Sequence, residues 1–217
     1  MKLQHLQIQT NNIQETTTFY QDVLNLSILE KDSNSISIQA GKSILKFIEN
    51  PQFDSIYHFA FNIPQNKLQE AIKWATNKLD LIIIEDTNVI ANFESWNANA
   101  IYFYDNNGNI LEFIARYDLD NSQTKSFSSK SILNISEIGI VNEHPLDLAN
   151  QLVTEHELEL FSKNDNNELF AAVGNDEGLL IIVRPGRNWY PTKTPSKSNS
   201  TEVRIENNGA QTELKFS

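Results

Sequence analysis

The chain contains no cysteine, which excludes disulfides, thiolate zinc sites and cysteine nucleophiles. Long apolar runs are also absent. No stretch is long enough to cross a bilayer, and the first residues lack the apolar run of a signal peptide. Basic residues are scarce: 17 Lys and Arg stand against 28 Asp and Glu, giving a net charge of -11. This balance argues against nucleic acid or a membrane as a partner, and we expect a soluble, cytoplasmic protein.

The chain does contain enough hydrophobic material for a sizeable core. Hydrophobic residues make up 40% of its 217 positions, including twelve Phe and three Trp. A chain of this length forms one large domain or two small ones. Internal repeats are therefore the first feature to look for.

The first 50 residues predict a βαβββ unit. Residues 3–9 alternate between apolar and polar side chains, as a half-buried strand does. A helix follows, with Asn12 as its N-cap and apolar side chains near helical spacing from Ile13 to Leu24. Short strands are predicted at residues 27–31, 35–39 and 43–48.

Two further segments repeat this order. The second has a strand at 56–61, a helix at 68–79, a strand at 81–84, and strands at 100–104 and 110–115 around a polar turn. The closing strands of the first two segments are nearly identical, ILKFI at 44–48 and ILEFI at 110–114. The third, weaker copy has strands at 135–140, 169–173 and 179–183, with a helix from Pro145 to about residue 155. Residues 201–206 and 211–216 predict a final hairpin.

Strand alternation places three possible metal ligands on one side of the predicted sheet. His5 and His58 occupy equivalent positions in their opening strands, opposite to the apolar face, and Glu112 points the same way from its closing strand. Two imidazoles and a carboxylate form a facial ligand set that leaves coordination positions open. The alternative is that each histidine is an ordinary polar residue of a strand. His144 and His156 flank the third helix and are expected at the surface.

Three motifs resemble the vicinal oxygen chelate superfamily, which includes glyoxalase I, extradiol ring-cleaving dioxygenases and fosfomycin resistance proteins. They are HLQI at 5–8, YHFAF at 57–61 and YFYDNNGNILEF at 102–113. The resemblance implies paired βαβββ modules around a divalent metal, with His5, His58 and Glu112 as ligands. It favours Fe²⁺ or Mn²⁺, with Zn²⁺ or Ni²⁺ as alternatives, a small-molecule substrate and a possible homodimer.

The predicted fold is therefore α+β, with repeated βαβββ modules forming a curved mixed sheet around a metal cavity and with helices outside. Residues 1–116 are expected to form the metal-binding pair of modules, 1–50 and 56–116. Residues 117–131 form a polar linker. Residues 132–217 form a third, degenerate module with a C-terminal hairpin, in which Glu137 and Ile181 take the ligand positions.

Lys46 departs from the glyoxalase I pattern, which places a Glu or Gln ligand in the closing strand of the first module. A charged ammonium cannot bind a metal. Lys46 is instead a candidate catalytic residue that pairs with a substrate oxygen or acts as a base. The alternatives are that Lys46 reaches solvent or pairs with Glu112 in a metal-free protein.

Two loops carry further candidates for ligand binding. The loop at 85–99 is expected to form a cavity wall, with Trp96, Asn97, Asn99 and neighbouring Tyr102 as substrate-binding residues. Its aromatic side chains could equally pack the sheet edge. After the third module come Arg184, Arg187, Trp189 and Tyr190, a group that suits either an anion or partner site or a solvated turn.

Two functions fit these features. The first is a metal-dependent enzyme that acts on a small molecule with vicinal oxygens. The alternative is a metal-free protein on the same scaffold that sequesters a small apolar or aromatic compound. The resemblance cannot separate them, because one fold supports many functions.

Overall fold

The computed structural model describes all 217 residues. Its first repeat forms as predicted, and the Asn12 side chain caps the helix by accepting hydrogen bonds from the backbone of Gln14 and Glu15. The helix ends in a π-helical turn at Phe19–Val23. The elements of this unit are β1 (Lys2–Thr10), α1 (Ile13–Thr18), β2 (Ser27–Lys31), β3 (Ser35–Ala40) and β4 (Ser43–Glu49).

The second unit differs from the prediction in one strand. Its elements are β5 (His58–Ile63), α2 (Leu68–Thr76), β6 (Ile90–Phe93), β7 (Ala98–Tyr104) and β8 (Ile110–Arg116). The strand expected at 81–84 is wrong, since only an isolated bridge joins Leu81 to Phe103. β6 occupies the edge of β7 from Ala98 to Ile101. Little of the edge of β7 therefore remains for the apolar run at 81–84 to pair with.

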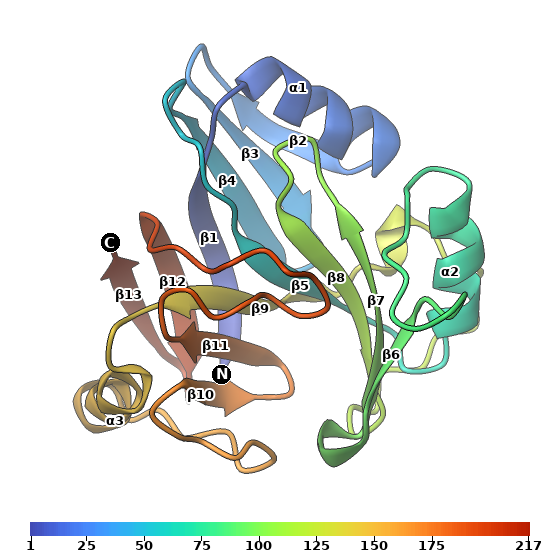
Figure 1. The fold of residues 1–217 in the computed structure, drawn as a ribbon. Coiled ribbons are helices and arrows are strands. Elements are labelled where there is room, and N and C mark those ends of the chain that lie inside the picture. The colour runs from blue at the N-terminus through green and yellow to red at the C-terminus, as the bar shows by residue number, and fades with distance from the viewer.

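The third unit and the C-terminal hairpin complete the chain. Their elements are β9 (Asn134–Val141), α3 (Pro145–His156), β10 (Phe170–Asn175), β11 (Gly178–Val183), β12 (Thr201–Asn207) and β13 (Ala210–Phe216). All thirteen strands belong to one mixed sheet, and each helix packs on strands of its own unit (Figure 1). The predicted α+β class with a mixed sheet and outer helices is thus confirmed.

The order of strands decides which units face each other. In every unit the opening strand pairs in parallel with its own closing strand, so β1 pairs with β4, β5 with β8 and β9 with β11. β9 lies between β1 and β5 and runs antiparallel to both. The second unit therefore adjoins the third unit. β1 pairs with β12 along its other edge. The expected direct pairing of the first two units does not occur, because β9 separates their opening strands.

The sheet is buried on both faces where the second and third units meet. Phe59, Phe61 and Phe113 belong to the main core between sheet and helices. Ala60 and Ile181 belong to a smaller cluster on the opposite face. This second face holds the polar residues described below. None of the helices has the length and apolar character needed to span a membrane.

Gly41 marks the closest approach between the first unit and the segment that leads into β9. It has a φ of +61°, and an added Cβ would lie 2.2 Å from both the carbonyl carbon and the oxygen of Leu133. The next backbone amide, of Lys42, donates to that same carbonyl oxygen at 2.7 Å. The β3–β4 turn is therefore fixed against the backbone at Leu133 and has no room for a side chain.

We expect Gly41→Ala to destabilise the fold by more than Gly209→Ala. Gly209 also has a positive φ, +83°, but an added Cβ there meets nothing within 4 Å. Both variants incur left-handed backbone strain of about 1–2 kcal/mol, and only Gly41→Ala adds a steric clash of about 1–3 kcal/mol. Urea unfolding measures the difference. Equal losses of unfolding free energy in the two variants would show that the backbone at Leu133 shifts to accommodate the added methyl group and that the clash does not destabilise the fold.

Candidate metal site

Three buried acid and imidazole side chains converge on the inner face of the sheet. The possible ligand atoms of His58, Glu112 and Glu137 all lie within 4.8 Å of one another. Their convergence follows from strand register, since Ala60 on β5 is paired with Glu112 on one side and with Glu137 on the other. The methyl group of Ala60 leaves room for both carboxylates above it. His58 lies two residues before Ala60 and so shares its face.

The tautomer of His58 follows from its hydrogen bond. Its Nδ1 lies 3.0 Å from the carbonyl oxygen of Ile110, which only accepts, so Nδ1 carries the hydrogen and Nε2 presents a lone pair. Burial lowers the pKa of His58 to about 4, and the ring is neutral at pH 7. This is how metal-binding histidines are usually oriented, with one ring nitrogen on a carbonyl and the other on the metal.

Glu112 faces that lone pair, and the hydroxyl of Tyr102 is its one hydrogen-bond donor. Its Oε2 is 3.9 Å from Nε2 of His58, and its Oε1 is buried with no hydrogen-bond partner. Burial, and secondly the charge of Glu137, raise the pKa of Glu112 well above its usual value. Two acceptors that face each other away from water require a proton or a cation between them.

Glu137 is held by a buried arginine. The guanidinium of Arg116 is fully buried and forms an ion pair with Glu137. It also reaches Ser136 Oγ at 3.3 Å and Asp176 Oδ1 at 3.4 Å. Burial raises the pKa of Glu137, while Arg116 opposes that rise. Arg116 therefore orients Glu137 and neutralises part of its charge.

The ion pairs continue from Arg116 to the surface. Lys163 binds Asp176 at 2.6 Å and the exposed Asp118 at 2.7 Å. Arg116 lies at the end of β8, Glu137 on β9 and Asp176 in the turn between β10 and β11. The network therefore fastens the second unit to the third around the cluster.

The donor set suits a divalent cation. One neutral imidazole and two carboxylates could supply three ligands and leave coordination positions open, a set that suits hard first-row metals. The orphaned Oε1 of Glu112 gains a partner when a cation is present. Ile181, at the position equivalent to Glu112 in the third unit, supplies no fourth ligand.

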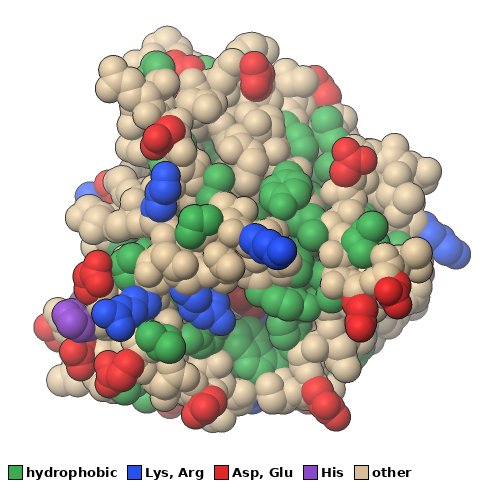
Figure 2. All heavy atoms as spheres, in the orientation of Figure 1, with side chains coloured by type: hydrophobic (Ala, Val, Ile, Leu, Met, Phe, Trp, Pro, Cys, Tyr) green, Lys and Arg blue, Asp and Glu red, His purple; other side chains and the backbone are tan.

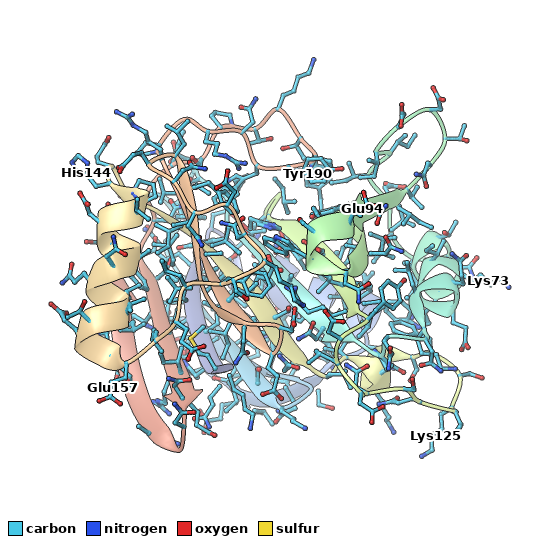
Figure 3. The ribbon with its side chains drawn as sticks, turned by 90° about the horizontal axis from the view of Figure 1, so that it is seen from below. Lys73, Glu94, Lys125, His144, Glu157 and Tyr190 are labelled. Atoms are coloured by element: carbon cyan, nitrogen blue, oxygen red, sulfur yellow. The ribbon has the colours of Figure 1, made fainter.

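The cluster lies at the base of a cavity of about 250 Å³. Aromatic side chains form most of its wall: Phe93, Trp96, Tyr102, Phe170, Trp189 and Tyr190. In the space-filling view, hydrophobic side chains surround a hollow with Lys or Arg side chains at its rim (Figure 2). Seen from below, Tyr190 lies between α3, flanked by the labelled His144 and Glu157, and α2, which carries Lys73 (Figure 3).

The structure corrects the predicted ligand set. His58 and Glu112 are brought together, but His5 is not part of the cluster, and Glu137 stands in its place. His5 lies on β1 opposite Arg204 of β12. Burial, then the charges of Arg204 and Lys46, lower the pKa of His5. The alignment of the three repeats places Glu137 at the position of His5 and His58. This was the feature of the sequence that could have identified Glu137 as a member of the cluster.

The other predicted site residues divide between the cavity and other places. Trp96 and Tyr102 line the cavity. Asn97 and Asn99 do not; their side-chain amides donate to Asp118 at 2.7 Å and to the Tyr117 hydroxyl at 3.0 Å. They therefore tie the start of β7 to the segment that follows β8.

Lys46 does not face the cluster. It lies on β4 of the first unit, where it is paired with Gln7 and Ser37. The expected contact of Lys46 with a substrate oxygen or with Glu112 in this cavity is wrong for the same reason as for His5: β9 separates the first unit from the second. The equivalent position of the third unit, Ile181, is the one that lines the cavity.

Comparisons with known proteins agree with this fold. Residues 2–60 match the family model of the Glyoxalase/Bleomycin resistance protein/Dioxygenase superfamily. A Bacillus subtilis protein described as a "putative dioxygenase" superposes with a TM-score of 0.59 and 14% identity, over 84% of this chain and 63% of that one. A glyoxalase I mutant from Zea mays gives a TM-score of 0.59 and 14% identity, over 91% and 71%. No curated protein sequence matches.

These comparisons confirm the resemblance to glyoxalase and dioxygenase proteins that the sequence motifs predicted. At 14% identity the two structures establish the shared fold alone. The present chain spans 63% of the length of the Bacillus subtilis protein. Reaction and substrate therefore have to be argued from the residues of this site.

We expect Arg116→Met to lower the free energy of unfolding by about 3–5 kcal/mol, because it leaves Glu137 buried and unpaired. The matched control is Lys163→Met, farther out in the same network, which should cost about 1 kcal/mol or less. Adding Glu137→Gln to Arg116→Met should restore part of the loss. Urea unfolding of the four proteins tests this, and a double variant no more stable than Arg116→Met would contradict it.

Proposed function

We propose that this chain is a metal-dependent enzyme of the glyoxalase or ring-cleaving dioxygenase type, acting on a small molecule with two adjacent oxygens. His58, Glu112 and Glu137 would hold the metal. The observation that carries the proposal is that the lone pair on Nε2 of His58 lies 3.9 Å from Oε2 of the buried Glu112, whose Oε1 has no hydrogen-bond partner. The Tyr102 hydroxyl is a hydrogen-bond donor to this carboxylate, but Oε1 stays unpaired, and a cation would satisfy both Oε1 and the His58 lone pair.

A divalent metal at this position would supply Lewis acidity to the vicinal oxygens of a substrate through its open positions. The two carboxylates in the ligand set favour the harder ions Mn²⁺ and Fe²⁺ over Zn²⁺ and Ni²⁺. Arg116 would keep Glu137 ionised and correctly oriented. Its role is that of an outer partner to a ligand.

The aromatic wall would position the substrate and exclude water. The rings of Trp189 and Tyr102 have centroids 5.3 Å and 6.1 Å from that of His58. Burial, and next the charge of Glu112, raise the pKa of the Tyr102 hydroxyl well above its usual value. Tyr102 therefore stays protonated, and its hydroxyl is a hydrogen-bond donor to Glu112. It would orient Glu112 as a ligand and stand beside the position of the substrate oxygens.

A metal-free binding protein is the second candidate. The observation in its favour is the Arg116–Glu137 ion pair, which already neutralises one of the two carboxylates. A proton on Glu112, whose pKa is raised, would then satisfy His58 without any metal. The aromatic cavity serves a binding protein equally well.

Metal titration separates the two candidates. In calorimetry with Mn²⁺, and with Fe²⁺ under anaerobic conditions, the wild-type protein should bind one ion. His58→Ala and Glu112→Gln should each weaken binding by at least about 100-fold, since loss of a ligand exceeds the effect of losing an outer partner. His5→Ala is the matched control and should bind like wild type. A wild-type protein without a saturable site would support the metal-free alternative.

Ile181→Glu provides an independent test of the position of the metal. Ile181 is buried in the cavity wall on the closing strand of the third unit. A carboxylate there should supply a fourth ligand and tighten Mn²⁺ binding. In metal-free protein it should instead destabilise the fold by about 1–3 kcal/mol, because it adds a buried acid. Thermal unfolding with and without Mn²⁺ measures both effects, and an unchanged Mn²⁺-induced shift in Tm would contradict the site.

A further inference from the structure

The segment between β11 and β12, residues 184–200, forms a strap beside the cavity. In Figure 1 it is the orange-red loop that crosses in front of β9 towards β8. Backbone hydrogen bonds fold residues 186–196 into a closed loop: Gly186 to Ser196 at 2.9 Å, Ser196 to Arg187 at 2.8 Å and Trp189 to Thr194 at 2.9 Å. These bonds fix the positions of the strap residues that line the cavity.

Trp189 anchors the strap over the cluster. It is 3% exposed, and its six-membered ring covers Gly139, where an added Cβ would lie 2.4 Å from Cη2. Only glycine at this point of β9 lets the indole lie so close to the sheet. The indole Nε1 is buried without a hydrogen-bond partner. The cavity lining therefore contains both an unpaired donor on Trp189 and an unpaired acceptor on Glu112.

Arg187 places a positive charge at the mouth of the same cavity. The residue is exposed and also lines the cavity. Its guanidinium lies 4.7 Å from the centre of the Phe170 ring, and its one side-chain hydrogen bond, to the carbonyl of Asn188, is long at 3.5 Å. Partial burial lowers the pKa of Arg187, and no acidic neighbour opposes this.

Arg187 forms no ion pair within the chain, and it lines the cavity, so its guanidinium is available to an anion that enters there. The other cation of the site, Arg116, is fully committed to Glu137 and Asp176. Between Arg187 and the cluster the wall is aromatic, with Tyr190 centred 5.8 Å from both Phe93 and Tyr102. The cavity thus presents a cation at its mouth, rings along its wall and carboxylates with an imidazole at its base.

We propose that the cavity selects a flat, single-ring ligand that bears an anionic substituent, and that Arg187 is the residue that determines this specificity. The anion binds the guanidinium at the mouth, the ring lies along the aromatic wall, and the oxygens opposite the anion reach the cluster. This inference rests on the proposed function for one point, that the adjacent oxygens of the ligand meet the metal at the cluster. It adds that the opposite end of the ligand carries an anionic group.

The chemistry of the cavity mouth, wall and base favours a ligand with a single ring and a carboxylate. A guanidinium offers paired N–H donors that match the two oxygens of a carboxylate, and stacking on Phe170 holds its plane. A cavity of about 250 Å³ is slightly smaller than the pockets that accept drug-sized ligands, about 300–1,000 Å³. The unpaired Nε1–H of Trp189 gains an acceptor if an oxygen of the ligand lies beside it.

A matched pair of probes tests the proposal: 3,4-dihydroxybenzoate and its neutral amide, 3,4-dihydroxybenzamide. Both present the same ring and the same vicinal oxygens, and only the charge at the far end differs. Binding is measured by calorimetry on full-length protein loaded with Mn²⁺. Wild type should bind the carboxylate about tenfold more tightly than the amide, the worth of one charge-assisted hydrogen bond.

Two substitutions locate the source of this preference. Arg187→Gln should abolish this preference, because it weakens binding of 3,4-dihydroxybenzoate and leaves the affinity for 3,4-dihydroxybenzamide unchanged. Arg184→Gln, three residues away and outside the cavity lining, is the matched control and should keep it. The proposal is overturned if wild type binds both probes equally, if the preference survives in Arg187→Gln, or if neither probe binds at millimolar concentration.

The same measurements on metal-free protein distinguish this proposal from the proposed function. If Mn²⁺ does not bind but the Arg187-dependent preference persists, the anion site stands and the metal-dependent enzyme does not. If Mn²⁺ binds as expected but the preference is absent, the metal site stands and the role of Arg187 is refuted.

Discussion

The buried guanidinium of Arg116 is the interaction on which the site depends. It joins the end of β8 to Glu137 on β9 and to Asp176 in the turn after β10. Without it, two buried carboxylates would lie close together with no ion pair to either, and their repulsion would work against the packing of the second unit on the third. Arg116 allows the acids to converge, and it orients Glu137 while leaving Glu112 without an ion pair to a cation.

The unpartnered acid gives the site its chemistry. A neutral imidazole whose hydrogen points away, towards Ile110, faces a carboxylate with a free oxygen. Such an arrangement is unfavourable until something positive enters it. Both side chains are buried, and burial strengthens the electrostatic interactions made there. An arrangement that costs stability, as His58 and Glu112 do, is typical of functional sites.

Much of this arrangement follows from residue patterns along the chain. The two-residue period of strands placed His58 and Glu112 on the inner face, and the repeated ILKFI and ILEFI segments identified equivalent positions. Repetition does not say which copies are neighbours in space. That choice depends on hydrogen bonding between edges far apart in sequence, so His5 was paired with His58 although Glu137 is the actual neighbour. The continuous apolar run at 81–84 has no periodicity that would have separated strand from loop. The strap has no periodicity either, and its position became clear only with Trp189 packed on Gly139.

The antiparallel pairing of β1 with β12 has a consequence for how the chain folds. Lys2 pairs with Glu206 and Leu3 with Ile205, so two strands that are far apart in the sequence must meet before this part of the sheet is complete. Contacts of such long sequence separation slow folding, because the entropy of closing the loop is lost before the pairing rewards it. Until then the edge of β1 is open to wrong partners, including the same strand of another nascent molecule. Conditions that keep unfolded molecules apart should therefore favour correct closure of the sheet.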